Sequence, residues 1–258
     1  MKLEEYIQER LATRGVLLMT HLIVGFPSLE ANWRMLEIMA EVDVDLVELQ
    51  MPFSEPVADG PTFARANQMA LEQGITLAQY FALLQRSSRT FGFPHLMMGY
   101  YNTAFRMGHE AFCAHLQESG AGGYILPDLP VEEYGELLVL SQAHGLDPIL
   151  LMAPTNTPLR LQKIGQQARG FVYAVARKGV TGSKSALDGE LYDFIGRCRQ
   201  VTRLPIGVGF GLRGGDDLRA LQGQAEIGIV GSVLLTTWEQ RGETGYRELL
   251  VELAAGRT

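Results

Sequence analysis

The sequence lacks the basic charge and the long apolar runs that nucleic-acid and membrane partners require. Its 258 residues include 22 Lys and Arg against 29 Asp and Glu, a net charge of −7. A nucleic-acid partner needs a basic face, which this balance argues against. No apolar run approaches the roughly 18 residues of a membrane-spanning helix. The acidic, amphipathic N-terminus also lacks the apolar centre of a signal peptide, so we expect a soluble, cytoplasmic protein.

Metal-binding patterns are missing as well. The five histidines are scattered and form no ligand set of the H-E-x-x-H type, so we predict no metal site. Cys113 and Cys198 are isolated within helical patterns and form no C-x-x-C pair. Such cysteines are typical of core thiols in a reducing compartment.

What the sequence does contain is an alternation of short apolar runs with helical stretches. After an N-terminal helix over 3–13, eight candidate strands follow. They are Val16–Val24, Leu46–Leu49, His95–Gly99, Tyr124–Leu126, Pro148–Met152, Phe171–Ala174, Pro205–Val208 and Ile227–Val230. Near-continuous apolar runs of this length are typical of parallel strands buried on both faces. The segments between them have helical spacing: we expect Ser28 to be the N-cap of the first such helix, and another helix to run from Val131 to His144 and end at Gly145.

Eight strand–helix units and no linker predict one α/β domain over residues 1–258, a (β/α)8 TIM barrel with an extra N-terminal helix. Such a barrel typically needs about 250 residues. An open doubly wound sheet is the structural alternative, which the strand count does not favour. In a barrel of this kind the active site forms at the carboxyl ends of the strands.

Two carboxylates lie at the end of the second predicted strand and in the loop that follows it. Glu48 alternates with Val47 and Leu49, so it points into the barrel mouth if those two pack outward. The alternative is a structural glutamate paired with a neighbour. Asp59 lies in the next loop, where it could equally cap the helix that begins near Pro61. Two carboxylates over one pocket suit reactions that move protons on and off carbon and oxygen.

Glycine-rich segments follow the last two predicted strands. Gly209-Phe210-Gly211 and Gly231-Ser232 lie where barrels of this type often hold a phosphate group on backbone N–H groups and a helix N-terminus. Residues 209–214 also match G-x-G-x-x-G, but the acidic residue that holds a ribose is missing after the next strand. We therefore reject dinucleotide binding. The basic, glycine-rich segment 177–185 suits either a lid over an anionic substrate or a flexible loop.

Taken together, these segments resemble the α subunits of tryptophan synthase, in order over nearly the whole chain. The motifs that carry the resemblance are Val47-Glu48-Leu49, Pro52-Phe53-Ser54, Ala58-Asp59-Gly60-Pro61, Tyr100-Tyr101-Asn102, Pro127-Asp128-Leu129-Pro130, Tyr173 with Arg177, Gly179-Val180-Thr181-Gly182, Gly209-Phe210-Gly211 and Gly231-Ser232. The string P-F-S-x-P-x-A-D-G-P is long and specific to that family.

The resemblance implies a lyase that splits indole-3-glycerol phosphate into indole and glyceraldehyde 3-phosphate. In that family Glu48 corresponds to the proton carrier and Asp59 to the group that binds the indole N–H. Tyr173 matches an active-site tyrosine, and Thr181 matches a lid residue that bonds Asp59 on closure. The phosphate site corresponds to Gly182, Gly211, Gly231 and Ser232. The resemblance also implies no cofactor, and a pyridoxal-phosphate β subunit as the partner in an α2β2 heterotetramer.

Two positions and one segment depart from the family pattern. Gln50 replaces a glycine, Glu55 replaces the aspartate of the P-F-S-D-P string, and 21–24 read His-Leu-Ile-Val instead of aromatic and threonine residues. We expect the Gln50 amide to donate a hydrogen bond to Glu48 and to weaken indole release, so that Gln50→Gly is more active. The alternative is an amide that turns away from the indole site and changes little. Two hypotheses compete with the lyase function. The first is a diverged paralogue, either a stand-alone indole producer or a lyase for a related aryl or sugar phosphate, and the second is a weakly active barrel that mainly binds and activates a β subunit.

Overall fold

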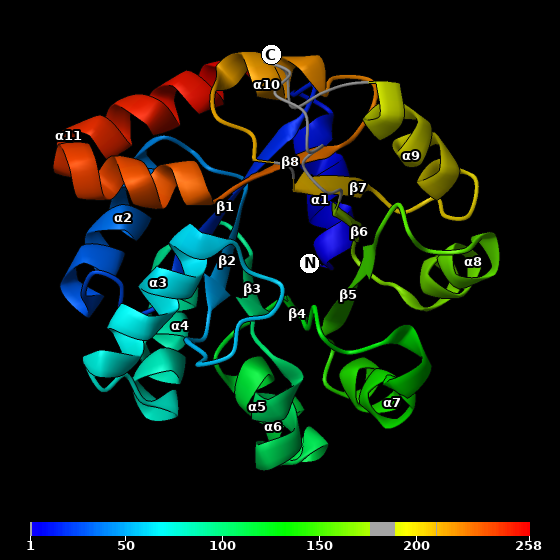
Figure 1. The fold of residues 1–258 in the computed structure, drawn as a ribbon, viewed down its shortest axis with the longest axis horizontal. Coiled ribbons are helices and arrows are strands. Elements are labelled where there is room, and N and C mark those ends of the chain that lie inside the picture. Colours follow the sequence, from blue (N-terminus) through cyan, green and yellow to red (C-terminus); the bar gives the residue numbers. More distant parts are fainter. Residues whose placement is uncertain (1, 176–188, 210) are drawn as a thin grey trace.

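The computed structural model describes residues 2–175, 189–209 and 211–258. Within these residues eight parallel strands form a closed barrel in which each strand pairs with the next and β8 pairs with β1 (Figure 1). The strands are β1 (Leu17–Ile23), β2 (Leu46–Gln50), β3 (His95–Met98), β4 (Gly123–Ile125), β5 (Asp147–Met152), β6 (Val172–Val175), β7 (Ile206–Gly209) and β8 (Ile227–Val230). The predicted barrel and its eight strands are confirmed, and the open sheet is excluded.

Helices cover the outside and one end of the barrel (Figure 1). They are α1 (Leu3–Leu11), α2 (Leu29–Glu41), α3 (Pro61–Glu72), α4 (Leu77–Thr90), α5 (Tyr101–Met107), α6 (His109–Glu118), the 3-10 turn η1 (Val131–Glu133), α7 (Gly135–Ala143), α8 (Pro158–Gln167), α9 (Gly189–Arg199), α10 (Gly215–Ala220) and α11 (Ser232–Ala255). None of the described helices is long and apolar enough to cross a membrane.

Side-chain alternation along the strands divides the apolar core into two layers. Outward residues such as Val47 and Leu49 join the large cluster between the strands and the helices. Inward residues such as Met19 and Leu46 form a second cluster inside the barrel. Glu48 lies between Val47 and Leu49 on the opposite face of β2, so it faces the barrel interior, as the alternation predicts.

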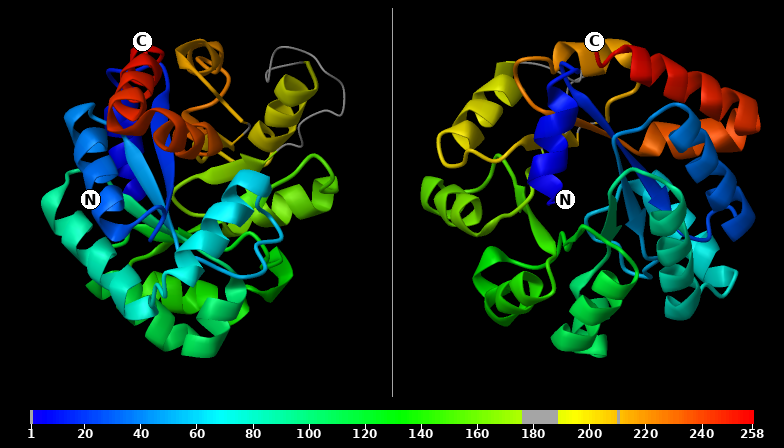
Figure 2. Two further views of the ribbon diagram at one scale, coloured as in Figure 1. Left: turned by 60° about the vertical axis from the view of Figure 1, so that its left-hand side comes forward. Right: turned by 180° about the vertical axis from the view of Figure 1, so that it is seen from behind.

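The extra N-terminal helix closes the amino-terminal end of the barrel. Leu3 and Ile7 of α1 are buried in the interior cluster. Viewed from behind, α1 lies across this end of the barrel (Figure 2, right). The opposite end, where the strands finish, is therefore the end at which a ligand can enter.

Local signals in the sequence explain where several helices begin and end. The Ser28 side chain accepts a hydrogen bond from the Ala31 backbone N–H at 3.1 Å, so the predicted N-cap of α2 is confirmed. Gly145 follows α7 with a φ of +67°, the left-handed conformation expected after a helix end. The predicted start of that helix at Val131 is wrong, because Pro130 leads into a 3-10 turn and α7 begins at Gly135.

Candidate active site

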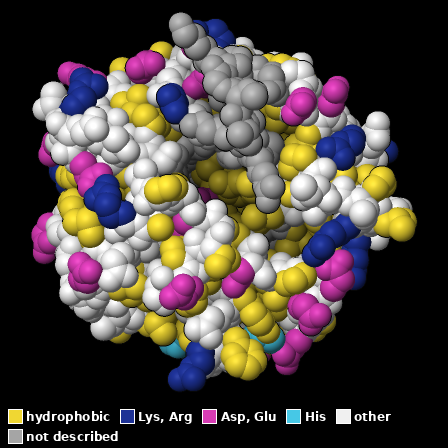
Figure 3. Space-filling model, viewed as in Figure 1, with side chains coloured by type: hydrophobic (Ala, Val, Ile, Leu, Met, Phe, Trp, Pro, Cys, Tyr) yellow, Lys and Arg dark blue, Asp and Glu magenta, His cyan; other side chains and the backbone are white. Residues whose placement is uncertain are grey.

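The carboxyl ends of the strands surround a hollow with polar groups at its rim. Figure 3 shows this hollow near the centre of the face, with hydrophobic side chains around it. The inward positions at this end of β1 and β2 are His21, Glu48 and Gln50, all buried. Tyr173 of β6 takes the corresponding inward position across the barrel and is partly buried. These inward positions bring an imidazole, a carboxyl, an amide and a phenol to this end of the barrel.

Glu48 is paired with a histidine. The strand register places His21 of β1 directly beside Glu48 of β2, and His21 Nδ1 bonds Glu48 Oε1. The other carboxyl oxygen, Oε2, is buried and has no hydrogen-bond partner among the described residues. Burial alone lowers the pKa of His21, but the charges of Glu48 and Asp59 and the hydrogen bonds outweigh burial and raise it. The Glu48 carboxyl therefore favours the protonated form of the His21 ring.

Gln50 joins this pair to Asp59. Its carbonyl oxygen lies 2.6 Å from His21 Nε2, and its Nε2 donates to Asp59 Oδ2 at 2.7 Å. The predicted hydrogen bond from Gln50 to Glu48 is therefore wrong, because His21 occupies the position beside the Glu48 carboxyl. The neighbouring amide of Asn67 also donates to Asp59 Oδ2, at 3.1 Å.

Asp59 belongs to this network and does not cap the next helix. The N-cap of α3 is Gly60, and no side chain caps it. Burial raises the pKa of Asp59 above its ordinary value of 3.8, while the Gln50 hydrogen bond and the His21 charge partly oppose this rise. The Asp59 loop is also held by Tyr100, whose hydroxyl oxygen accepts a hydrogen bond from the Ala58 backbone N–H at 3.1 Å. Asp59 is thus fixed at the rim with one carboxyl edge bound by amides.

Tyr173 lies near both carboxylates without bonding either. Burial, followed by the charges of Glu48 and Asp59, raises the pKa of Tyr173 well above its ordinary value. Its phenol is therefore neutral at any working pH. The ring lies against Gly209, where an added Cβ would be 2.6 Å from the hydroxyl oxygen. Tyr173 therefore borders both the carboxylates and the glycine-rich end of β7.

The predicted phosphate-site glycines lie at the ends of two neighbouring strands. β7 and β8 pair with Gly209 opposite Ile229, and Gly211 and Gly231 each follow two residues later. Gly211 has a φ of +63°, which favours glycine. Ser232 is the first residue of α11, so this helix directs its N-terminus toward the same end of the barrel. The predicted lid 177–185, with Thr181 and Gly182, lies outside the described residues.

Comparison with known proteins identifies the family. The family model described as tryptophan synthase alpha chain matches residues 7–255. The tryptophan synthase alpha chain of Syntrophotalea carbinolica is 41% identical and that of Desulfotalea psychrophila 40%, covering 93% and 94% of this chain and 95% of each relative. A chain of the Mycobacterium tuberculosis tryptophan synthase structure in space group F222 superposes with a TM-score of 0.91 at 35% identity, covering 99% of this chain and 97% of that one.

The chain belongs to the tryptophan synthase alpha chain family. It is accordingly a lyase of tryptophan biosynthesis, and the resemblance found in the sequence is confirmed. A chain of the tryptophan synthase complex from Pyrococcus furiosus has the same fold, with a TM-score of 0.84, 28% identity, and coverage of 92% of this chain and 97% of that one.

The sequence did not predict the roles of two residues in the polar network of this alpha chain, His21 and Asn67. His21 was noted only as part of a departure from the family pattern, although its alternation with Leu17 and Met19 already placed it on the inward face of the strand. Asn67 sits in the middle of α3, where nothing in the pattern marks a buried amide that reaches back to Asp59. Neither residue has a distinctive motif around it.

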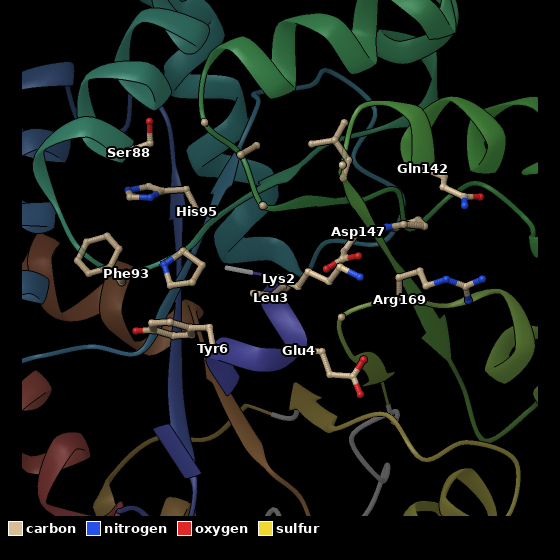
Figure 4. Close-up of a pocket in the computed structure, with 18 of the residues that line it drawn as sticks. Lys2, Leu3, Glu4, Tyr6, Ser88, Phe93, His95, Gln142, Asp147 and Arg169 are labelled. Atoms are coloured by element: carbon tan, nitrogen blue, oxygen red, sulfur yellow. The ribbon is translucent and has the colours of Figure 1, made fainter. Parts of the chain in front are cut away.

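A second hollow, at the amino-terminal end of the barrel, is not part of this site. It has a volume of about 810 Å³ and lies between α1 and the starts of the neighbouring strands, with Lys2, Tyr6, His95, Asp147 and Arg169 among its lining residues (Figure 4). Active sites of such barrels form at the carboxyl ends of the strands, so the mouth with Glu48 is the candidate site. Within the described residues, no group of three or more acidic, histidine or cysteine side chains is placed to hold a metal ion.

Proposed function

We propose that this alpha chain cleaves indole-3-glycerol phosphate into indole and glyceraldehyde 3-phosphate by a retro-aldol reaction. The observation that carries the proposal is the free, buried Oε2 of Glu48 at the barrel mouth, opposite Tyr173 and beside Asp59. The bond that breaks joins the indole ring carbon to the side-chain carbon that bears the hydroxyl. The hydroxyl loses its proton and becomes the aldehyde, and the ring carbon gains a proton, so the reaction needs no net proton.

Glu48 is the group that can carry this proton in both directions. A single carboxyl oxygen that takes the hydroxyl proton and returns a proton to the ring carbon balances the reaction. The apolar walls of the mouth suit an indole ring, and a carboxylate oxygen of Asp59 can accept the indole N–H. A carboxylate there stabilises positive charge that develops on the ring nitrogen during cleavage. Tyr173 borders the space for the ring.

The phosphate group of the substrate belongs at the glycine-rich end of β7 and β8. The hydrogen-bond donors there are backbone N–H groups, those of Gly211, Gly231 and Ser232, the last at the start of α11. The two glycines have no side chain that would compete for the space. The N-terminal dipole of α11 favours the phosphate charge. Thr181 and Gly182 remain proposed parts of this site from the family resemblance.

The test is indole release from indole-3-glycerol phosphate by the purified chain, alone and with a tryptophan synthase β subunit. Indole release in both conditions, faster with the partner, supports the proposed reaction. Indole release that the β subunit does not change points to a stand-alone enzyme. A barrel that mainly activates its partner would release no indole under either condition while still raising β-subunit turnover.

We propose further that the chain assembles with a β subunit through the face around the barrel mouth, in an α2β2 heterotetramer. Relatives are solved as a tryptophan synthase complex. The same face of this chain exposes three large hydrophobic side chains, Val57 at 80%, Phe105 at 65% and Leu159 at 79%. Each follows the end of a strand, at the end of the barrel that holds the candidate site, and exposed apolar side chains near a site can mark protein contacts. The cytoplasmic location expected from the sequence stays a prediction.

Sedimentation of the mixed chains tests this docking face. Val57→Asp and Leu159→Asp should each weaken the complex at least tenfold, since each puts a charge into a buried contact. Val251→Asp is the matched control, because Val251 is 54% exposed on α11 and lies far from the strand ends along the helix. Equal complex formation by all three variants would remove this face from the interface.

A further inference from the structure

The proposed reaction leaves His21 without a role, although it is one of the most completely bound side chains of the site. It is 6% exposed, and its ring stacks on Phe63 of α3 with centroids 4.4 Å apart and an angle of 26°. An added Cβ at Gly231 would lie 3.2 Å from His21 Cβ and 2.5 Å from Phe63 Cζ, so the residue before α11 packs against both side chains. The ring therefore has little freedom to turn away from Glu48.

A backbone N–H group determines which way the side-chain amides of Asn67 and Gln50 are oriented. The Phe53 backbone N–H can only donate, and it donates to Asn67 Oδ1 at 3.0 Å. Asn67 Nδ2 is therefore the donor toward Asp59 Oδ2 and toward the Phe63 carbonyl oxygen, at 3.1 and 2.9 Å. Asn67 Oδ1 also lies 3.3 Å from Gln50 Nε2 as an acceptor. Both contacts fix the Gln50 amide with its nitrogen toward Asp59.

This orientation determines the protonation of His21. The Gln50 carbonyl oxygen faces His21 Nε2, so Nε2 must carry a proton to donate to it. Nδ1 faces the Glu48 carboxyl across the second hydrogen bond. Since a neutral imidazole has one N–H, it can donate to only one of these oxygens, whereas an imidazolium donates to both. The pair therefore holds one proton between Nδ1 and Oε1, in addition to the proton on Nε2.

We propose that His21 is a positioning residue for Glu48: the imidazolium binds Oε1, leaves Oε2 as the oxygen that faces the substrate, and couples Glu48 to Asp59 through Gln50. This role rests on the proposed function of Glu48 as the proton carrier. Without His21, either carboxyl oxygen could turn toward the substrate, and the buried carboxylate would lose its cation.

The charged neighbours of His21 agree with this role. Glu48 faces it from β2, and Asp59 faces it from the loop before α3. Tyr173, on β6, is neutral and lies near both carboxylates. Phe63 and Gly231 add no charge. The protonated His21 is thus one buried cation near two carboxylates, and a buried ion pair is screened less than one at the surface.

Side-chain nitrogen NMR of the full chain tests the protonation directly and does not depend on activity. We expect His21 to show two protonated nitrogens through neutral pH, and to titrate about 1 unit or more lower in Glu48→Gln. His95 is the internal reference, because it is also buried but bonds Ser87 and has a pKa lowered by burial to about 4. The proposal would be overturned if His21 is neutral at pH 7, or if the pKa of His21 is the same in Glu48→Gln as in the wild type.

Kinetics of two replacements test the positioning. His21→Phe keeps a ring against Phe63 but removes both donors, and should lower kcat about 10- to 100-fold with little change in KM, as expected for the loss of a hydrogen bond to a charged group. His21→Asn returns one donor and should recover part of kcat. His115→Asn is the control, on an exposed histidine. Unchanged kcat and an unchanged pH profile in His21→Phe would refute the positioning role.

The two measurements separate this proposal from the proposed function. If the wild-type chain releases no indole but NMR shows a protonated His21 bound to Glu48, the proposed lyase reaction is wrong and the His21–Glu48 pair is still supported. If the wild type releases indole but His21 is neutral and the His21 variants are fully active, the lyase reaction is supported and the positioning role is wrong. Melting curves of each variant show whether a lost activity reflects unfolding.

Discussion

His21 on β1 and Glu48 on β2 stand side by side in the register of two parallel strands, and the imidazole binds one oxygen of the carboxyl. This pairing gives a buried carboxylate a cation and leaves its second oxygen free. A hydrogen-bonded route then continues through Gln50 to Asp59. The two carboxylates predicted from the sequence are therefore parts of one connected site.

Gln50→Gly should lower indole release, the opposite of the expectation from sequence alone. The amide holds His21 and Asp59 in place, and its removal leaves His21 Nε2 and Asp59 Oδ2 each short of one partner. Loss of hydrogen bonds to charged groups suggests a decrease of about tenfold or more in kcat/KM. Steady-state kinetics check this, and equal or higher activity in Gln50→Gly would mean that the amide is not a support of the site.

Gly231→Ala should weaken substrate binding more than it affects folding. An added Cβ would lie 2.5 Å from Phe63 Cζ, so the Phe63 ring and the His21 ring stacked on it must shift. Overpacking of this kind typically costs about 1–3 kcal/mol. We expect a higher KM and a smaller rise in melting temperature with glycerol phosphate. Gly196→Ala, where an added Cβ meets nothing within 4 Å, is the control and should behave as wild type.

The pH dependence follows from two raised pKa values. Asp59 must be ionised to accept the indole N–H, so kcat/KM should rise with pH through a pKa above the ordinary 3.8. His21 must be protonated to hold Glu48, so kcat/KM should fall through a pKa above 6.5. Because the His21 pKa is raised on folding, its contribution to the free energy of unfolding is complete below 6.5 and is lost as the pH rises through the folded value.

Profiles of kcat/KM against pH for the wild type and His21→Phe test both predictions. The rise at acidic pH is the acidic limb of the profile, and the fall at alkaline pH is its alkaline limb. The alkaline limb should disappear in His21→Phe while the acidic limb stays. An alkaline limb that persists unchanged in the variant would assign that titration to another group.

Asp45→Asn should destabilise the barrel at its closed end. Asp45 is fully buried and accepts from the Leu18 backbone N–H at 2.9 Å and from Arg257 Nη1 at 3.0 Å. Breaking a buried ion pair costs about 3 kcal/mol or more. Asp43→Asn is the matched control, because Asp43 bonds Arg10 in the same cluster but its side chain is 59% exposed, so its loss should cost less than about 1 kcal/mol. Urea unfolding measures both, and equal losses would contradict the buried-pair account.

The barrel itself could be predicted from the sequence because its order comes from local patterns. Buried parallel strands appear as short apolar runs, and the predicted run Val16–Val24 differs from β1 by one residue at each end. Alternation placed Glu48 in the mouth for the same reason. Ser28 and Gly145 marked helix ends through backbone chemistry that acts within a few residues.

The contacts within the site could not be predicted, because they depend on register and on distant elements. Nothing in the pattern shows that β1 and β2 pair with His21 beside Glu48, so Gln50 was given the wrong partner. The choice between capping and ligand binding for Asp59 also needed the position of Asn67, eight residues later on α3. Residues far apart in the chain decide the hydrogen bonds of the site.

The most direct test of the account is the rate of indole release by Glu48→Gln relative to the wild type. The amide matches the carboxyl in size and can still accept from His21, but it cannot take a proton from the substrate hydroxyl. Removal of a general acid–base group typically lowers the rate about 10²- to 10⁴-fold. We predict a loss of that size with an unchanged melting temperature shift on glycerol phosphate binding. Near-wild-type indole release by Glu48→Gln would contradict the central role of Glu48.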